Sequence, residues 1–128
     1  MDKAPLTFKE MCARFDVTPR TLRYYEYIEL LRPAREGRAR FYGPREVARM
    51  TLILRGRRYG FSLEEIRQWL EIYDTQGSRA QMVDLLERSE RQIAVLEEQQ
   101  AELSRTIEEL RILRDQVAAG LAPGRAEG

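Results

Sequence analysis

The chain has 128 residues, of which 43% are hydrophobic and 34% charged, enough for one small domain and an additional elongated segment. One cysteine and no histidine exclude a disulfide framework within the chain and a Cys/His zinc site, and we expect no metal or cofactor. We see no signal-peptide pattern and no apolar run of membrane-spanning length, so we expect a cytoplasmic protein without a membrane partner.

The net charge of +1 conceals an uneven distribution of charge along the chain. Residues 14–58 carry twelve arginines and five acidic residues, whereas residues 76–128 carry seven arginines and ten acidic residues. A basic half followed by a mildly acidic half is typical of a polyanion-binding head joined to a segment with another role.

The first predicted helix begins after Thr7. Thr7-Phe8-Lys9-Glu10 has the form of a capping box, and apolar residues then recur at helical spacing at positions 8, 11, 12 and 15. Cys12 belongs to this apolar stripe. We expect it to be a buried core residue, because nothing in the pattern indicates a charged or histidine neighbour that would lower the pKa of its thiol.

A second short helix is predicted to follow Thr18, which suits the N-cap, with Pro19 at the first helical position. Arg20, Arg23 and Tyr24 lie at i, i+3 and i+4 and so share one face of this helix. Guanidiniums and a phenol suit phosphate oxygens and base edges, although a solvated charged face is the plainer alternative. Two short helices this close together predict a helix-turn-helix with the second as the reading helix.

The segment after the reading helix predicts a small two-stranded hairpin, a wing, because Pro33, Gly37 and two aromatic residues punctuate it. Arg38 and Arg40 would share one strand face, with Tyr42 next along it. This face is a candidate second phosphate contact; the alternative is an ordinary polar hairpin face.

Two further helices are predicted before residue 75. The first buries a stripe of Val47, Met50 and Leu54 and ends before Gly60, which suits a glycine cap. Its last turn is strongly basic, more so than compensation of the helix dipole requires. The second begins with a capping box at residues 62–65 and carries an apolar face.

A long helix is predicted from a third capping box, Ser78-Arg79-Ala80-Gln81, to Ala119, because this stretch contains no proline or glycine. Apolar residues fill most positions of a heptad seam. The a positions are Leu86, Ile93, Gln100, Ile107 and Arg114, and the d positions are Met82, Ser89, Leu96, Leu103, Leu110 and Val117. A lone helix cannot bury such a stripe, and no turn allows it to fold back, so we expect a homodimer. The polar seam residues would help to fix the register.

The chain therefore divides into three predicted parts. Residues 1–75 form a DNA-binding head, residues 76–119 a dimerising coiled-coil helix, and residues 120–128 a flexible tail. The fold class is mainly α: a winged helix-turn-helix head with a small β-hairpin wing, followed by the long helix.

The motifs of the head occur in a specific order and spacing: Val17-Thr18-Pro19-Arg20-Thr21-Leu22-Arg23-Tyr24-Tyr25-Glu26, Leu30-Leu31, Pro33, Arg40 to Tyr42, and Gly60-Phe61-Ser62-Leu63-Glu64-Glu65-Ile66. Over residues 6–74 the chain resembles the MerR family of bacterial transcription regulators, and the long helix matches in kind. The resemblance implies a second, helical wing and an antiparallel coiled coil. The antiparallel direction comes from the resemblance alone.

The resemblance also implies function. Such regulators bind palindromic double-stranded promoter DNA with an overlong spacer and twist it, so that RNA polymerase, an indirect partner, can engage both promoter elements. By position, Arg20, Arg23 and Tyr24 would lie on the reading helix, Arg40 and Tyr42 on the first wing, and Arg57 at the base of the second wing. The implied location is the bacterial cytoplasm, at the nucleoid. Whether the protein activates or represses stays open.

Four departures from the family pattern stand out. Glu29 replaces the glycine that usually follows the reading helix, and Gly56 replaces a helix former. The cysteines of the metal sensors are absent, and a short tail stands where drug-binding members have a large domain. Without these two kinds of effector site, two alternatives stay open. The effector is a small metabolite, with Trp69 and Tyr73 as candidate pocket residues, or the protein has no effector.

Two other functions compete with a dimeric regulator. A DNA-architectural or excisionase-like protein would share the reading head but need no dimer, and a coiled-coil adaptor would use its basic head to bind protein or RNA. We expect no enzyme, because the chain offers no histidine, no nucleophile motif and no glycine-rich phosphate loop.

Overall fold

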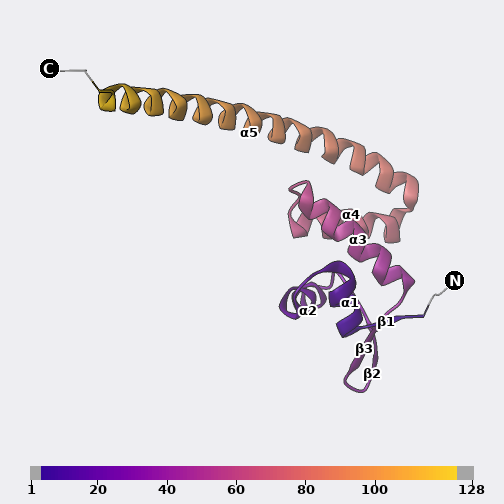
Figure 1. Cartoon of the computed structure of the whole chain (residues 1–128). Helices are drawn as coiled ribbons and strands as arrows, with labels where there is room; N and C mark the ends of the chain where they lie inside the picture. The colour runs from indigo at the N-terminus through magenta and orange to yellow at the C-terminus, as the bar shows by residue number, and fades with distance from the viewer. Residues whose placement is uncertain (1–3, 124–128) are drawn as a thin grey trace. The chain divides into compact units, whose positions relative to one another are not determined.

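The computed structural model describes residues 4–123. Its elements in chain order are β1 (Leu6–Thr7), α1 (Phe8–Phe15), α2 (Pro19–Tyr27), β2 (Ala34–Glu36), β3 (Ala39–Tyr42), α3 (Pro44–Arg58), α4 (Leu63–Gln76) and α5 (Ser78–Leu121) (Figure 1). The chain divides into two compact units, one ending at Asp84 and the other starting at Leu85. The first unit, which we call the head, thus includes the first turns of α5. The predicted fold class, a winged helix-turn-helix head and a long helix, is confirmed.

The starts of three helices follow from local capping, as predicted. Thr7 and Glu10 form a reciprocal capping box at α1, and Ser62 and Glu65 form another at α4. The hydroxyl of Thr18 accepts a hydrogen bond from the backbone N–H of Thr21 at 3.0 Å, which caps α2.

The third predicted capping box is wrong. Ser78 is already the first helical residue of α5, and the backbone N–H of Gln81 donates to the carbonyl of Gly77 at 3.2 Å. The side chain of Gln81 instead donates to the carbonyl of Trp69 at 3.2 Å, while the Trp69 indole donates to the Gln81 carbonyl at 3.0 Å. This reciprocal pair fastens the start of α5 to α4.

The sheet of the head has three antiparallel strands in the order β1-β3-β2, where the sequence predicted two. In the register, Leu6 faces Tyr42 across β1 and β3, and Arg35 faces Arg40 across β2 and β3. Gly37 has φ +62° in the turn between β2 and β3, a conformation that suits glycine. The hairpin is thus joined through β1 to the start of α1.

The core of the head brings together side chains of α1 to α4 and of the sheet. Its buried apolar side chains are Met11, Leu22, Tyr25, Leu30, Leu31, Tyr42, Met50, Ile53, Phe61, Ile66 and Leu70. On α3 the buried positions are Glu46, Met50 and Ile53, while the predicted Val47 and Leu54 are only half-buried at the edge of the core. Cys12 is half-buried, and desolvation raises the pKa of its thiol despite the nearby charge of Arg23.

Helices α3 and α4 lie side by side (Figure 1). A Cβ atom at Gly56 would lie 3.0 Å from Cγ1 and Cδ1 of Ile66, closer than ordinary van der Waals contact. Gly56 therefore lets the two helices approach, which explains why a helix former is absent there.

The helix α5 is continuous over 44 residues, and none of its residues is buried. Every apolar side chain of the predicted seam is exposed, including Leu86, Ile93, Leu96, Leu103 and Leu110. The helix continues to Leu121, past the predicted start of the tail, and residues 124–128 of that tail lie outside the described residues. No helix within residues 4–123 has the length and apolar character needed to cross a membrane.

Candidate nucleic-acid interface

Helix α2 is anchored on one side and free on the other. Leu22 and Tyr25 are buried in the core of the head, which fixes the orientation of the helix. After Pro19 at its first position, the exposed side chains are Arg20, Arg23, Tyr24 and Tyr27. At i, i+3, i+4 and i+7 they share one side of the helix, which places two guanidiniums and two phenols on a single surface.

The aromatic ring of Phe8 lies beneath two of the predicted site residues. The guanidinium carbons of Arg23 and Arg40 are 5.3 and 5.1 Å from the centroid of this ring. Both distances lie within the range of a cation–π interaction. Phe8, the first residue of α1, therefore holds one guanidinium from α2 and another from β3 near each other.

Tyr42 is placed differently from the prediction. Its side chain is fully buried and its hydroxyl donates a hydrogen bond to Glu26 of α2. Burial first, and then the hydrogen bond and the negative charge of Glu26, raise the pKa of the Tyr42 phenol far above its ordinary value. The prediction that Tyr42 lies on an exposed wing surface is wrong, because its side chain is buried in the core of the head and Glu26 accepts a hydrogen bond from its hydroxyl.

Arg40 shares the same face of β3 and points to the same carboxylate. Its Nε lies 2.8 Å from Oε1 of Glu26, whose side chain is only 8% exposed. Arg35 reaches Glu26 at 3.9 Å from the neighbouring strand. Arg40 is thus held between Glu26 and Phe8 and is only partly exposed, so it joins the wing to α2.

The exposed positive charge of the wing lies at its tip. Arg38 occupies the turn between β2 and β3, is exposed, and makes no ion pair with any described residue. Such a side chain is free to meet a phosphate group.

A second exposed basic group ends α3. Arg55, Arg57 and Arg58 lie in its last turn, where positive charge also compensates the helix dipole. Arg57 donates one N–H to the carbonyl of Phe61 at 3.1 Å, which fixes the side chain against the turn between α3 and α4. Arg57 therefore lies where α3 turns into α4, and its contact with DNA stays a prediction.

Glu29 follows α2 with φ +65°, in the left-handed region that glycine adopts without strain. The backbone N–H of the next residue, Leu30, donates to the carbonyl of Tyr25 at 2.9 Å and closes the end of the helix. Because glutamate replaces the usual glycine here, the backbone is strained just after the candidate reading helix.

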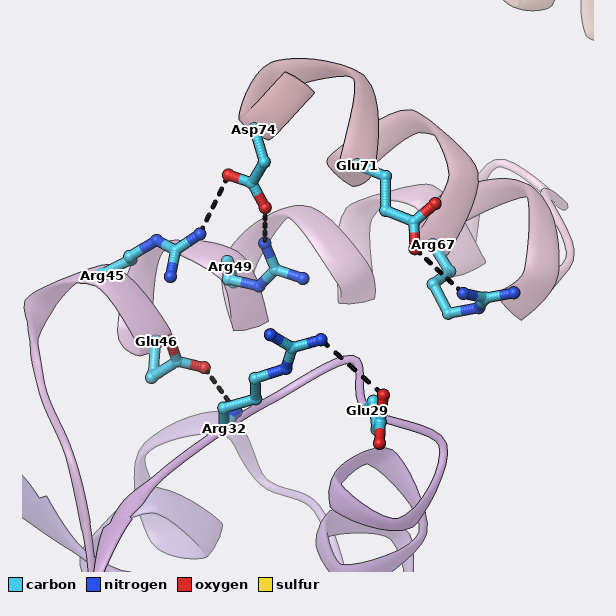
Figure 2. A pocket seen from close by; sticks show the side chains of 8 residues that line it. All are labelled: Glu29, Arg32, Arg45, Glu46, Arg49, Arg67, Glu71 and Asp74. Atoms are coloured by element: carbon cyan, nitrogen blue, oxygen red, sulfur yellow. Dashed lines mark hydrogen bonds and ion pairs between the residues drawn. The ribbon is translucent and has the colours of Figure 1, made fainter. Parts of the chain in front are cut away.

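A cleft of charged side chains lies between the segment after α2 and the helices α3 and α4 (Figure 2). Four arginines and four acidic residues line it: Glu29, Arg32, Arg45, Glu46, Arg49, Arg67, Glu71 and Asp74. Asp74 accepts a hydrogen bond from Arg45 at 3.0 Å and lies 3.9 Å from Arg49. The charges of the lining residues balance one another.

The aromatic residues suggested for an effector pocket do not line this cleft. Trp69 is half-buried against the core and bonded to Gln81, and Tyr73 is exposed. Within residues 4–123 no group of three or more His, Cys, Asp or Glu side chains is arranged to hold a metal ion.

Tyr27 is a candidate site residue that the sequence reasoning missed. Its side chain is 83% exposed, one turn beyond Tyr24 on the same side of α2. The spacing of seven residues between Arg20 and Tyr27 places both on one side of a helix and is the sequence signal for Tyr27.

Two family models match the chain. The model described as MerR HTH family regulatory protein matches residues 6–72, and the one described as MerR, DNA binding matches residues 47–113. A curated HTH-type transcriptional regulator of Pseudomonas aeruginosa is 37% identical over 109 residues, which cover 83% of this chain and 75% of that protein.

Solved structures share the fold. A transcriptional regulator of the MerR family from Bacillus cereus superposes with a TM-score of 0.70 at 27% identity, covering 96% of this chain and 87% of that one. HiNmlR, a MerR family regulator lacking the sensor domain and bound to promoter DNA, superposes with a TM-score of 0.66 at 23% identity, covering 91% and 94%. Regulators of this family bind promoter DNA as dimers. With its reading helix, its two wings and its long exposed helix, the chain belongs to the MerR family and is a DNA-binding transcriptional regulator.

Proposed function

We propose that the protein binds a palindromic promoter element as a homodimer and reads it through α2. Arg20, Arg23 and Tyr24 meet base edges and adjacent phosphates in the major groove, because guanidiniums and phenols supply donors that match them. The observation that carries this assignment is the exposed side of α2, since buried Leu22 and Tyr25 leave the helix only this surface to offer.

Each wing supplies a phosphate contact. Arg38 at the tip of the first wing and Arg57 at the base of the second are exposed and basic. Arg40, which the sequence suggested as a direct contact, instead orients the first wing through Glu26. Such phosphate contacts fix the position of a protein on DNA without reading its sequence.

Two heads held by one dimer grip two half-sites, which is how a palindromic operator matches a two-fold symmetric protein. We propose that this grip also twists the DNA between the half-sites and so alters how RNA polymerase engages the promoter. The protein then acts in the bacterial cytoplasm, at the nucleoid.

The dimer forms through α5 in the antiparallel direction. In an antiparallel pair each a position faces a d position of the other helix. When the two seams overlap along their whole length, Met82 at a d position meets the partner's Leu121 at an a position. The same register sets Ser89 against the partner's Arg114. The two polar seam residues near the ends of the seam therefore meet each other instead of apolar side chains.

Other antiparallel registers are worse. Sliding the helices by one heptad sets Arg114 against the partner's Met82 in one direction and the partner's Leu96 in the other. Either shift buries a charge against an apolar side chain. In the full-overlap register Glu90 also flanks the partner's Arg111, a pair of opposite charges.

Binding titrations on the operator and on random DNA, at several salt concentrations, test the DNA contacts. The operator is found first by footprinting the DNA that flanks the gene. We expect Arg20→Ala to weaken operator binding by about 1–3 kcal/mol and to narrow the gap between operator and random DNA. We expect Arg38→Ala to weaken both DNAs alike and to reduce the salt slope by about 1. The reverse pattern would show that Arg38 reads the bases and Arg20 contacts a phosphate.

Cysteine cross-linking in a Cys12→Ala background tests the register. With Ser89→Cys and Arg114→Cys together, we expect interchain disulfides, and with either substitution alone we expect none. A parallel coiled coil would instead cross-link Ser89→Cys to its own copy.

A further inference from the structure

The segment that leaves α2 is held at two points by side chains of α3. The backbone N–H of Arg32 donates to Oε1 of Glu46 at 2.9 Å (Figure 2). Nε of Arg49 donates to the carbonyl of Leu30 at 3.0 Å. Glu46 and Arg49 are one turn apart on α3, so one side chain satisfies an N–H and the other a C=O of the same short segment.

Both side chains are withdrawn from solvent. Glu46 is buried, and the side chain of Arg49 is only 16% exposed. Desolvation lowers the pKa of Arg49 below its ordinary value, and the negative charges of Glu46 and Asp74 offset only part of this shift. The guanidinium of Arg49 depends on its bonds to the Leu30 carbonyl and Asp74, because a buried charge without a partner is strongly unfavourable.

Arg49 also reaches the other helix of the second wing. Its Nη1 lies 3.9 Å from Oδ2 of Asp74 on α4, and the other oxygen of Asp74 accepts from Arg45 of α3 at 3.0 Å. A single side chain thus contacts the segment that closes α2 and the end of α4. Leu30 also donates its N–H to the Tyr25 carbonyl, so the segment is bonded to the end of α2.

We propose that Arg49 is a positioning residue that sets the second wing relative to the reading helix, so that Arg57 meets a phosphate when α2 occupies the major groove. Glu46 and Asp74 complete this connection. Arg49 itself contacts no DNA. The inference rests on the proposed assignment of α2 and of Arg57 to DNA.

The variant Arg49→Lys tests this role. It keeps the positive charge, but a single ammonium on a flexible chain cannot bond the Leu30 carbonyl and approach Asp74 with a planar fork. The matched control is Arg67→Lys, since Arg67 lines the same cleft but, among residues 4–123, forms its ion pairs with Glu64 and Glu71 of its own helix. Asp74→Asn, at a half-exposed position on α4, is a second variant that leaves the core of the head untouched.

The full-length dimer of each variant is footprinted on the operator below its melting temperature, with one probe for major-groove bases and another for phosphates. For Arg49→Lys we expect the base protections to remain, the outermost phosphate protections to disappear and the affinity to fall at least tenfold. Asp74→Asn should show the same pattern more weakly, and Arg67→Lys should match the wild type.

A double-mutant cycle separates positioning from stability. We expect Arg57→Ala to weaken binding in the wild type and in Arg67→Lys, and to add little in Arg49→Lys. Additive losses with an unchanged footprint would overturn the inference and leave Arg49 a residue of the fold alone. A wild type without outer phosphate protection, insensitive to Arg57→Ala, would overturn the proposed second-wing contact together with the inference.

Discussion

The head and the helix α5 use apolar residues in opposite ways. In the head the apolar side chains of α1 to α4 and the sheet bury one another within a single chain. In α5 the apolar side chains form a seam, and none of its described residues is buried. The head therefore buries its apolar residues within one chain, whereas the seam of α5 is the surface that we propose packs against a second chain.

The largest expected effect comes from breaking the seam. Replacing Leu103 and Leu110 by Lys places uncompensated charges where the second helix must pack, so we expect the dimer to be lost completely. Sedimentation measures the assembly, and near-ultraviolet circular dichroism of Trp69 reports on the head, which should stay folded. A dimer of unchanged stability would show that α5 is not the interface.

A smaller effect is expected from breaking the core of the head. Met50 is fully buried, so Met50→Ala should lower the free energy of unfolding of the head by about 2–5 kcal/mol. This loss should be the same at every protein concentration, because all partners of Met50 lie in its own chain. Denaturant titrations at several concentrations measure it, with Leu96→Ala as the matched control. Only the loss caused by Leu96→Ala should vary with concentration.

The smallest effect is a gain. Glu29 has φ +65°, so Glu29→Gly should relieve strain and raise the free energy of unfolding by up to about 1 kcal/mol, after the larger entropy of glycine in the unfolded chain is subtracted. Thermal melting checks this expectation. Asp16→Gly, at φ +53°, is the control and should gain less, since aspartate tolerates this conformation better. A loss of stability at Glu29→Gly would mean that the ion pair of Glu29 with Arg32 outweighs the strain.

Features that depend on neighbours in the sequence were predictable. The caps at Thr7, Thr18 and Ser62 bond to residues three positions away, and the heptads of α5 repeat along one helix. The exposed side of α2 follows for the same reason, because the spacing of Arg20, Arg23 and Tyr24 fixes a common face.

Features that depend on distant segments were not predictable. Alternation correctly put Arg40 and Tyr42 on one face of β3, but it could not reveal that both side chains reach Glu26 of α2. β1 has only two residues, too few to show a period. The bond from Arg49 to the Leu30 carbonyl joins a side chain to a backbone atom nineteen positions away, and a carbonyl carries no sequence signal.

A substitution at Phe8 would change DNA binding in related proteins without changing the reading helix itself. The ring supports Arg23 of the reading helix and Arg40 of the first wing, although it is itself half-buried at the start of α1. One substitution at this position would release both guanidiniums together without changing the identity of any residue that we propose to contact DNA. Operator preference could therefore drift between gene copies whose reading helices are identical, so comparing only the contact residues of two such copies would overestimate how alike their target sites are.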